Sequence, residues 1–423
     1  MEQQSMYCGR RGRATRHRAL LVLGAALGAS LLVGGCASSS APKAAKATSF
    51  AFWPLPPAEP RIQFVRSFQA AGDLNLQKAS GLQELIFGKE DVRDTAIEKP
   101  YGVAMRNGRI YVCDIRYPAL TVMDLTNRQM RRMGTTGVNH LTHPVDVAVA
   151  DDGWVYVADN DRNAVLVYDT NERYARTIGE SGMTPVALAT HGDRLYVCDI
   201  KGQNVAIFNR GTGELLGKFG QAGDGDGEFR VPLAVDVDRA GDVYVTDMMR
   251  CRVQKFGPDG GYKGGVGELG DYAGSFARPK QLAVDSDGVV YVVDAAFQNV
   301  QMFNDEFALL MSFGAGGNFP GAMNLPAGIC VSDDRLDLVK DLVHEGFEPK
   351  RYVAVTNQFG PAKVSLYVMG QLRPGYSVAD LAPASVEVSE GVGQNEASKG
   401  LSALEGPEPG EGDVQSPEGG GLE

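Results

Sequence analysis

The chain has 423 residues, of which 43% are hydrophobic and 22% are charged, so it can bury a large core and is neither disordered throughout nor fibrous. Its formal net charge of −11 at pH 7 argues against general nucleic-acid binding. The 53 glycines favour an architecture with many turns over one with long helices.

Residues 1–36 have the pattern of an export signal. The basic stretch "GRRGRATRHR" precedes the apolar run "ALLVLGAALGASLLV", which is too short for a comfortable membrane-spanning helix. The small residues of "VGGC" then lead to Cys36. This order resembles the signal of bacterial lipoproteins, and the resemblance implies that Cys36 carries the lipid and begins the mature chain. The alternative is a plain secretory signal that happens to contain a Cys.

The residue after Cys36 bears on localisation. Ala37 stands there rather than Asp. By resemblance to the sorting rule of bacteria with two membranes, this implies a lipid-anchored protein of the cell envelope, on the periplasmic face of the outer membrane or outside it. Residues 37–60 are rich in Ala, Ser and Pro, and they predict a tether that holds a domain away from the membrane.

An internal repeat predicts the architecture of the next 320 residues or so. Each unit opens with a proline and a short apolar strand, followed by a polar turn and a second strand of the type Tyr-Val-x-Asp. A third strand and a fourth strand that ends in Gly complete the unit. The opening prolines are Pro100, Pro144, Pro185, Pro232, Pro279 and Pro326.

Four short strands per period of 40 to 50 residues are typical of a propeller blade. The Pro…Gly-x-Tyr-Val-x-Asp…Val pattern resembles the NHL repeat, which implies an all-β, six-bladed β-propeller over residues 61–380. Such a repeat is specific for the fold and says little about function. The sixth unit lacks a fourth strand of its own, so we expect "RIQFVRSF" (61–68) to complete that blade and to close the ring.

Two further segments flank or interrupt this domain. Apolar residues near 80–88, in "SGLQELIFG", predict a short helix that either packs on the propeller or docks a partner. Residues 381–423 contain eight Glu, one Asp and one Lys among Gly, Pro and Ser. This acidic segment has few large apolar groups, so we expect it to be disordered.

The Asp of the Tyr-Val-x-Asp strand recurs in every blade but the last, where Asn replaces it. Catalysis needs one asymmetric set of groups rather than several copies around a ring. An Asp just past a strand can accept hydrogen bonds from nearby backbone N–H groups and fix the turn. We therefore predict a structural turn role for Asp114, Asp159, Asp199, Asp247, Asp294 and Asn357.

No catalytic residue, metal site or cofactor is predicted. The His140-x-x-His143 pair is a weak metal signal, and no phosphate-binding loop or nucleophile motif is evident. The loop "QAGDGDGEF" resembles a calcium loop in composition only. Cys113 and Cys198 occupy a small-residue position in two blades that are not neighbours, so no disulfide between them is expected.

Basic residues gather in the loops that a propeller places on one face, namely the turns before the first strands and the breaks after the second strands. They suggest a binding surface for an anionic ligand or an envelope protein, and the alternative is an ordinary solvated face. The candidate residues are Arg116, Arg162, Lys201, Arg230, Arg250, Arg278 and Lys280. The resulting hypothesis is a membrane-anchored binding or scaffold module, with a lyase or lactone-hydrolase type of enzyme as the alternative.

Overall fold

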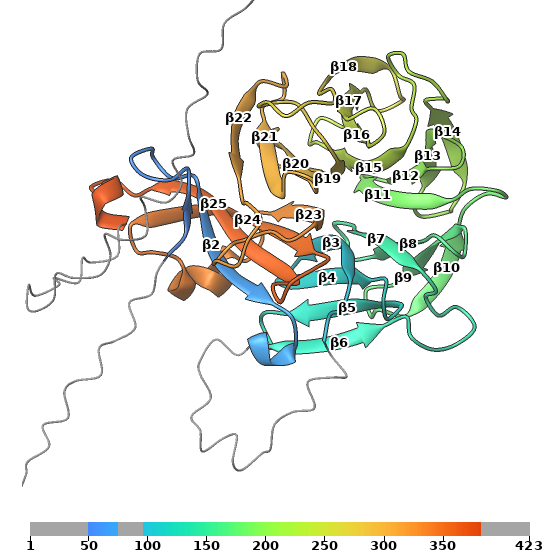
Figure 1. Cartoon of the computed structure of the whole chain (residues 1–423). Helices are drawn as coiled ribbons and strands as arrows, with labels where there is room; N and C mark the ends of the chain where they lie inside the picture. The colour runs from blue at the N-terminus through green and yellow to red at the C-terminus, as the bar shows by residue number, and fades with distance from the viewer. Residues whose placement is uncertain (1–49, 75–95, 382–423) are drawn as a thin grey trace, which may run out of the picture. The chain divides into compact units, whose positions relative to one another are not determined.

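The structure is a computed structural model that describes residues 50–74 and 96–381. Six antiparallel sheets follow one another as blades around a central axis, which confirms the predicted all-β, six-bladed β-propeller (Figure 1). The signal with Cys36, the helix expected near 80–88 and nearly all of the acidic tail lie outside the described residues. In the described part, no helix is long and apolar enough to cross a membrane.

The first three blades have four strands each. Blade one consists of β3 (Pro100–Arg106), β4 (Arg109–Asp114), β5 (Ala119–Asp124) and β6 (Gln129–Met133). Blade two consists of β7 (Pro144–Val149), β8 (Val155–Asp159), β9 (Ala164–Tyr168) and β10 (Tyr174–Ile178). Blade three consists of β11 (Pro185–His191), β12 (Arg194–Asp199), β13 (Asn204–Asn209) and β14 (Leu215–Phe219).

Blades four and five repeat this plan. Blade four consists of β15 (Pro232–Val237), β16 (Val243–Asp247), β17 (Arg252–Phe256) and β18 (Tyr262–Val266). Blade five consists of β19 (Pro279–Val284), β20 (Val290–Asp294), β21 (Asn299–Phe303) and β22 (Leu309–Phe313). In blades one to five the opening proline pairs with the repeated Asp, so the start of the first strand and the end of the second lie together.

Blade six joins the two ends of the domain. Its strands are β23 (Pro326–Ser332), β24 (Phe347–Asn357) and β25 (Val364–Leu372), and β2 (Ile62–Phe68) pairs antiparallel with β25. The prediction that an N-terminal strand completes the last blade is therefore correct. A further short strand, β1 (Phe52–Trp53), pairs with β2, and Phe52 is only 7% exposed. Residues 50–60, assigned to the tether by sequence, thus contribute a fifth strand to this sheet.

The insertion in blade six forms a short 3-10 helix, η3 (Leu336–Leu342), and lengthens β24 to eleven residues. Gln63 of β2 secures this insertion, because its amide donates to Leu342 O at 3.2 Å and accepts from His344 N at 3.0 Å. The closing strand is therefore bound to both β25 and the insertion.

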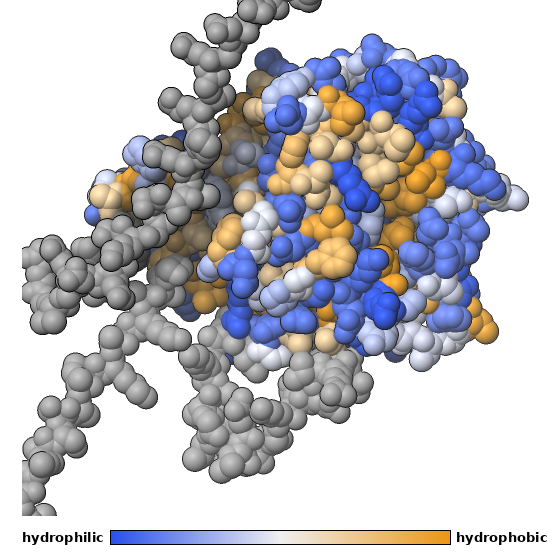
Figure 2. Space-filling model, viewed as in Figure 1, coloured by the Kyte–Doolittle hydropathy of each residue, from blue (hydrophilic) through white to orange (hydrophobic). Residues whose placement is uncertain are grey.

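The core lies between neighbouring blades. Alternate side chains of each strand point to opposite faces of its sheet, so one face of a blade packs against the preceding blade and the other against the following blade. The Tyr of the Tyr-Val-x-Asp strand is fully buried in four consecutive blades, at Tyr156, Tyr196, Tyr244 and Tyr291. The outside is mixed, and Figure 2 shows hydrophobic and hydrophilic residues side by side on the visible surface of the propeller.

Candidate functional site

Two faces of the ring differ in the loops that they carry. One face, here called the Asp face, carries the turns before the first strands and the breaks after the second strands. The repeated Asp lies at the end of the second strand on this face. All seven basic candidate residues belong to these turns, breaks or adjoining strand starts. The opposite face carries the connections from first to second strands and from third to fourth strands.

The repeated Asp holds the Asp-face loops in place. Asp159, which is fully buried, accepts hydrogen bonds from Thr142 N at 2.6 Å, His143 N at 3.0 Å and Arg162 N at 3.2 Å. The carboxylates of Asp114, Asp159, Asp199 and Asp294 thus join the turn before the first strand of their blade to the break after its second strand, whereas Asp247 binds the turn alone. Asn357 accepts from Asn324 N and donates to Ala362 O, so it makes a similar connection without charge.

This arrangement also orients the basic residues. Asp114 accepts from Lys99 N at 3.2 Å and Arg116 N at 2.9 Å, and Asp294 accepts from Arg278 N. The backbone of these three basic residues is thereby fixed, while no side-chain partner is found for any of them in the described ranges.

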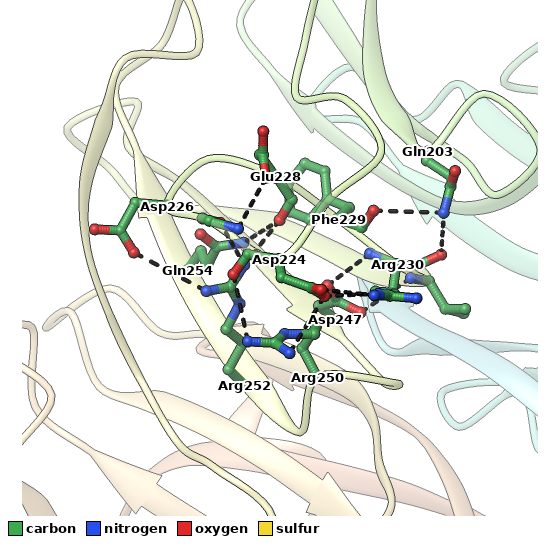
Figure 3. Close-up of polar contacts among 12 residues, drawn as sticks. Gln203, Asp224, Asp226, Glu228, Phe229, Arg230, Asp247, Arg250, Arg252 and Gln254 are labelled. Carbon is green, nitrogen blue, oxygen red and sulfur yellow. Dashed lines mark hydrogen bonds and ion pairs between the residues drawn. The ribbon is translucent and has the colours of Figure 1, made fainter.

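Blade four differs, because an acidic loop neutralises its basic residues (Figure 3). Asp224 accepts two hydrogen bonds of 2.6 Å from the guanidinium of Arg230 and lies 3.2 Å from Arg250. Arg252 donates to the backbone oxygens of Gly225 and Glu228. The guanidinium of Arg230 pairs bidentately and is exposed, so this part of the rim offers little uncompensated charge.

Blades two and three present the remaining candidates. Arg162 donates to the carbonyl oxygens of Val138 and His140, at 3.1 and 2.6 Å, which leaves its charge unneutralised. Lys201 is exposed, and its backbone N–H donates to Asp199 at 3.1 Å.

Lys280 of β19 is the exception among the basic residues because its side chain is buried and only 5% exposed. Its ammonium donates to Oε1 of Gln358 at 3.2 Å and lies 5.4 Å from the centre of the Tyr101 ring. No carboxylate lies within ion-pair distance of Lys280 among residues 50–74 and 96–381. Burial, together with the nearby charges of Arg278 and Lys99, lowers the pKa of Lys280 to about 8.

Next to Lys280, on the side toward the opposite face, the central channel is closed. Asp146 of β7 and Gln281 of β19 belong to opposite blades, and the Gln281 amide donates to Asp146 Oδ1 across the channel. Beyond this pair, toward the opposite face, lie a cavity of 230 Å³ and one of 660 Å³, which share lining residues such as Met105 and Val284. The larger cavity is bordered by several acids, including Asp238, Asp285 and Asp333.

The polar groups of the channel have structural partners. The first strand is the inner edge of each blade, so its inward backbone groups lack a strand partner. Asp146 accepts from Leu188 N at 2.8 Å, Asp236 from Val284 N at 2.8 Å and Gln281 from Ile329 N at 3.0 Å. Each side chain thus satisfies an N–H of the next blade.

Burial also changes the proton affinity of these channel acids. It raises the pKa of Asp146 to about 7 and that of Asp236 to about 6. The hydrogen bonds that these carboxylates accept favour their charged forms and oppose this rise only in part. The acids of the larger cavity are likewise engaged, since Asp238 accepts from Tyr244 OH and Asp285 from Tyr291 OH. Sequence reasoning missed Asp146 and Gln281. The signal that could have found them is that the other four blades have Gly or Ala at the same position of the first strand.

The inner strands also approach one another closely. A Cβ at Gly102 would lie 2.6 Å from the Asp146 Cα, and a Cβ at Gly328 would lie 2.2 Å from Tyr101 O. Within the described ranges, no group of three or more His, Cys, Asp or Glu residues is placed to hold a metal ion. Cys113, Cys198, Cys251 and Cys330 are free thiols, and burial raises the pKa of each.

Comparisons with known proteins agree with this architecture. The NHL repeat family model matches residues 141–168, which include β8 and β9. A search of curated proteins finds no match. A solved structure of a protein of unknown function from Bacteroides thetaiotaomicron is 17% identical, with a TM-score of 0.53 over 73% of this chain and 75% of that chain.

Two solved enzyme structures are more distant. A streptogramin B lyase is 9% identical, with a TM-score of 0.47 over 64% of this chain and 94% of that chain. A gluconolactonase from Xanthomonas campestris is 12% identical, with a TM-score of 0.47 over 65% of this chain and 87% of that chain. At these identities the likeness concerns the fold alone. The chain carries an NHL repeat and folds as a six-bladed β-propeller.

Proposed function

We propose that the protein is a lipid-anchored binding module of the cell envelope whose Asp face binds an anionic group of a partner. The observation that carries this proposal is the buried ammonium of Lys280, which has an amide oxygen and an aromatic ring beside it but no counter-ion in the described part of the chain. Buried charges in proteins are normally paired. An incoming carboxylate or phosphate supplies the missing negative charge.

The surroundings of Lys280 favour this assignment. Arg278 and Lys99 lie close enough to lower its pKa, and their backbones are fixed by Asp294 and Asp114. A fixed group of cations pays less ordering entropy on binding than a flexible one. The repeated acids therefore serve the site by positioning its cations, and they need not contact the ligand.

The enzyme alternative has no comparable support. A site in the central channel would lie beside Asp146, Asp236 or Gln281, and each of these side chains already bonds to a neighbouring strand. We therefore place the functional surface on the Asp face, with lipid on Cys36 as the anchor.

Calorimetric titration of the full chain with citrate at low salt tests the proposal. Binding is expected for the parent chain and is expected to be lost in Lys280→Met. Lys255→Met is the matched control, because Lys255 also lies over a tyrosine ring, at 5.1 Å from Tyr244, but is paired with Asp242 at 3.3 Å. Equal citrate binding by the parent and Lys280→Met would refute the assignment.

A further inference from the structure

Large apolar side chains occur at corresponding positions of the Asp-face breaks in four consecutive blades. The break after the second strand carries a large apolar residue in blades four, five, six and one, in the order Met249, Phe297, Phe359 and Tyr117. Met249 is 62% exposed, Phe359 61% and Tyr117 51%, whereas Phe297 is half-buried. These four residues are called the apolar arc below.

At the corresponding two positions, blades two and three have polar or small residues instead, with Asp161 and Arg162 in one break and Lys201 and Gly202 in the other. The arc therefore spans four of the six blades and leaves out blades two and three. Lys280 and Arg278 belong to blade five, and Lys99 precedes blade one, so these three cations lie within the four blades of the arc. Arg162 and Lys201, which likewise have no carboxylate partner in the described residues, belong to blades two and three.

A surface of this kind suits a polypeptide better than a small anion. Aromatic residues and Met are enriched in the cores of protein interfaces, and complementary charge orients the partner. A citrate ion would leave the apolar arc exposed. The occupant must therefore offer carboxylates and apolar side chains at short spacing along one chain.

We infer that this surface binds the chain's own acidic tail, residues 382–423. That segment contains eight Glu, one Asp and one Lys, and it alternates acids with apolar residues in "VEVSE" (386–390) and "LSALE" (401–405). Its charge is opposite to that of Lys280, Arg278, Lys99 and Arg116. This inference rests on the proposed function, since the tail occupies the same anion site as an external partner.

The tail is long enough to reach the site. Its 42 residues start after Leu381, which is buried against the propeller, and they span up to about 140 Å when extended. The radius of gyration of a domain of this size is roughly 20 Å. A tethered segment competes at an effective concentration in the millimolar range, so a weak contact is enough to slow the entry of an external anion.

Zero-length carbodiimide cross-linking of the full chain at low salt tests this inference. The reagent joins a tail carboxylate to a lysine amine as an amide with loss of water, and mass spectrometry identifies the pair. Lys99, Lys201 and Lys363 report on the Asp face, whereas Lys340 and Lys350 lie at the opposite end of blade six and serve as controls. Cross-links to the first group are expected to exceed those to the second about tenfold and to fade with added salt.

A full-length variant with the eight tail Glu changed to Gln separates the two proposals. Its citrate affinity is expected to exceed that of the parent chain. Even cross-linking of both faces, or equal citrate affinity of the two chains, overturns the tail inference and leaves the anion site standing. If citrate binds neither the parent nor the variant, the proposed function itself fails.

Discussion

Replacing Lys280 by Met is expected to stabilise the protein near neutral pH. A lysine pKa that falls from 10.5 to about 8 in the folded chain means that the fold disfavours the charged form by about 3 kcal/mol. Met retains much of the apolar stem that packs beside Tyr101, and it loses the hydrogen bond to Gln358, worth about 1 kcal/mol. The expected net gain in the free energy of unfolding is about 2 kcal/mol at pH 7.

The pH dependence gives this prediction its specific signature. Because the unfolded chain holds the Lys280 proton more tightly, the parent gains stability as pH rises from about 8 to 10.5, and below pH 8 it carries the whole penalty. The advantage of Lys280→Met is therefore expected to shrink over that range.

Urea denaturation of both chains at pH 7 and pH 10 measures the effect. Lys255→Met is expected to lower stability at pH 7, since Lys255 has a carboxylate partner in Asp242. A loss of stability in Lys280→Met at pH 7, similar to that of the control, would refute the claim that this ammonium is buried without compensation.

Three further predictions concern anchoring, closure and the channel. Cys36→Ser is expected to release the propeller from membranes or to leave unprocessed precursor, and normal processing with retained membrane association in a fractionation assay would contradict the lipid anchor. Deleting residues 61–68 is expected to abolish cooperative unfolding because it exposes the edge of β25, whereas deleting 382–423 is not expected to do so; a cooperative melt of the 61–68 deletion would disprove this closure. The raised pKa of Asp236, about 6, means that the folded chain binds its proton more tightly, so stability is lost as pH rises from 4 to 6, by up to about 3 kcal/mol, and Asp236→Asn is expected to remove that loss in thermal melts; an unchanged pH slope in the variant would contradict it.

Much of the fold could be predicted because the repeat is regular. The opening proline recurs in all six units and the Tyr-Val-x-Asp strand in the first five, and the missing fourth strand of the last unit identified 61–68 as its replacement. The strand β1 could not be found in this way, because two residues in front of a proline show no periodicity. The strand β1 forms because it pairs with the edge of β2 that does not contact β25.

The candidate site was predictable only in its location. The turns and breaks place all seven basic residues on the Asp face. Whether their charges are neutralised by acids, however, depends on contacts between loops. The loop that contains Asp224 has an ordinary turn composition, and only the folded chain brings it to Arg230 and Arg250. Likewise, Asp146 and Gln281 are 135 residues apart in sequence and meet because their blades are opposite.

The pKa of Lys280, measured by NMR of the full chain with its tail Glu changed to Gln, tests the anion site most directly. ¹³C-methylation of the lysines and a pH titration in the absence and presence of citrate give the two values. A pKa of about 8 without citrate that rises when citrate is bound agrees with a buried ammonium that accepts an anionic partner. An ordinary lysine pKa in the free protein, or a low value that citrate leaves unchanged, would contradict it.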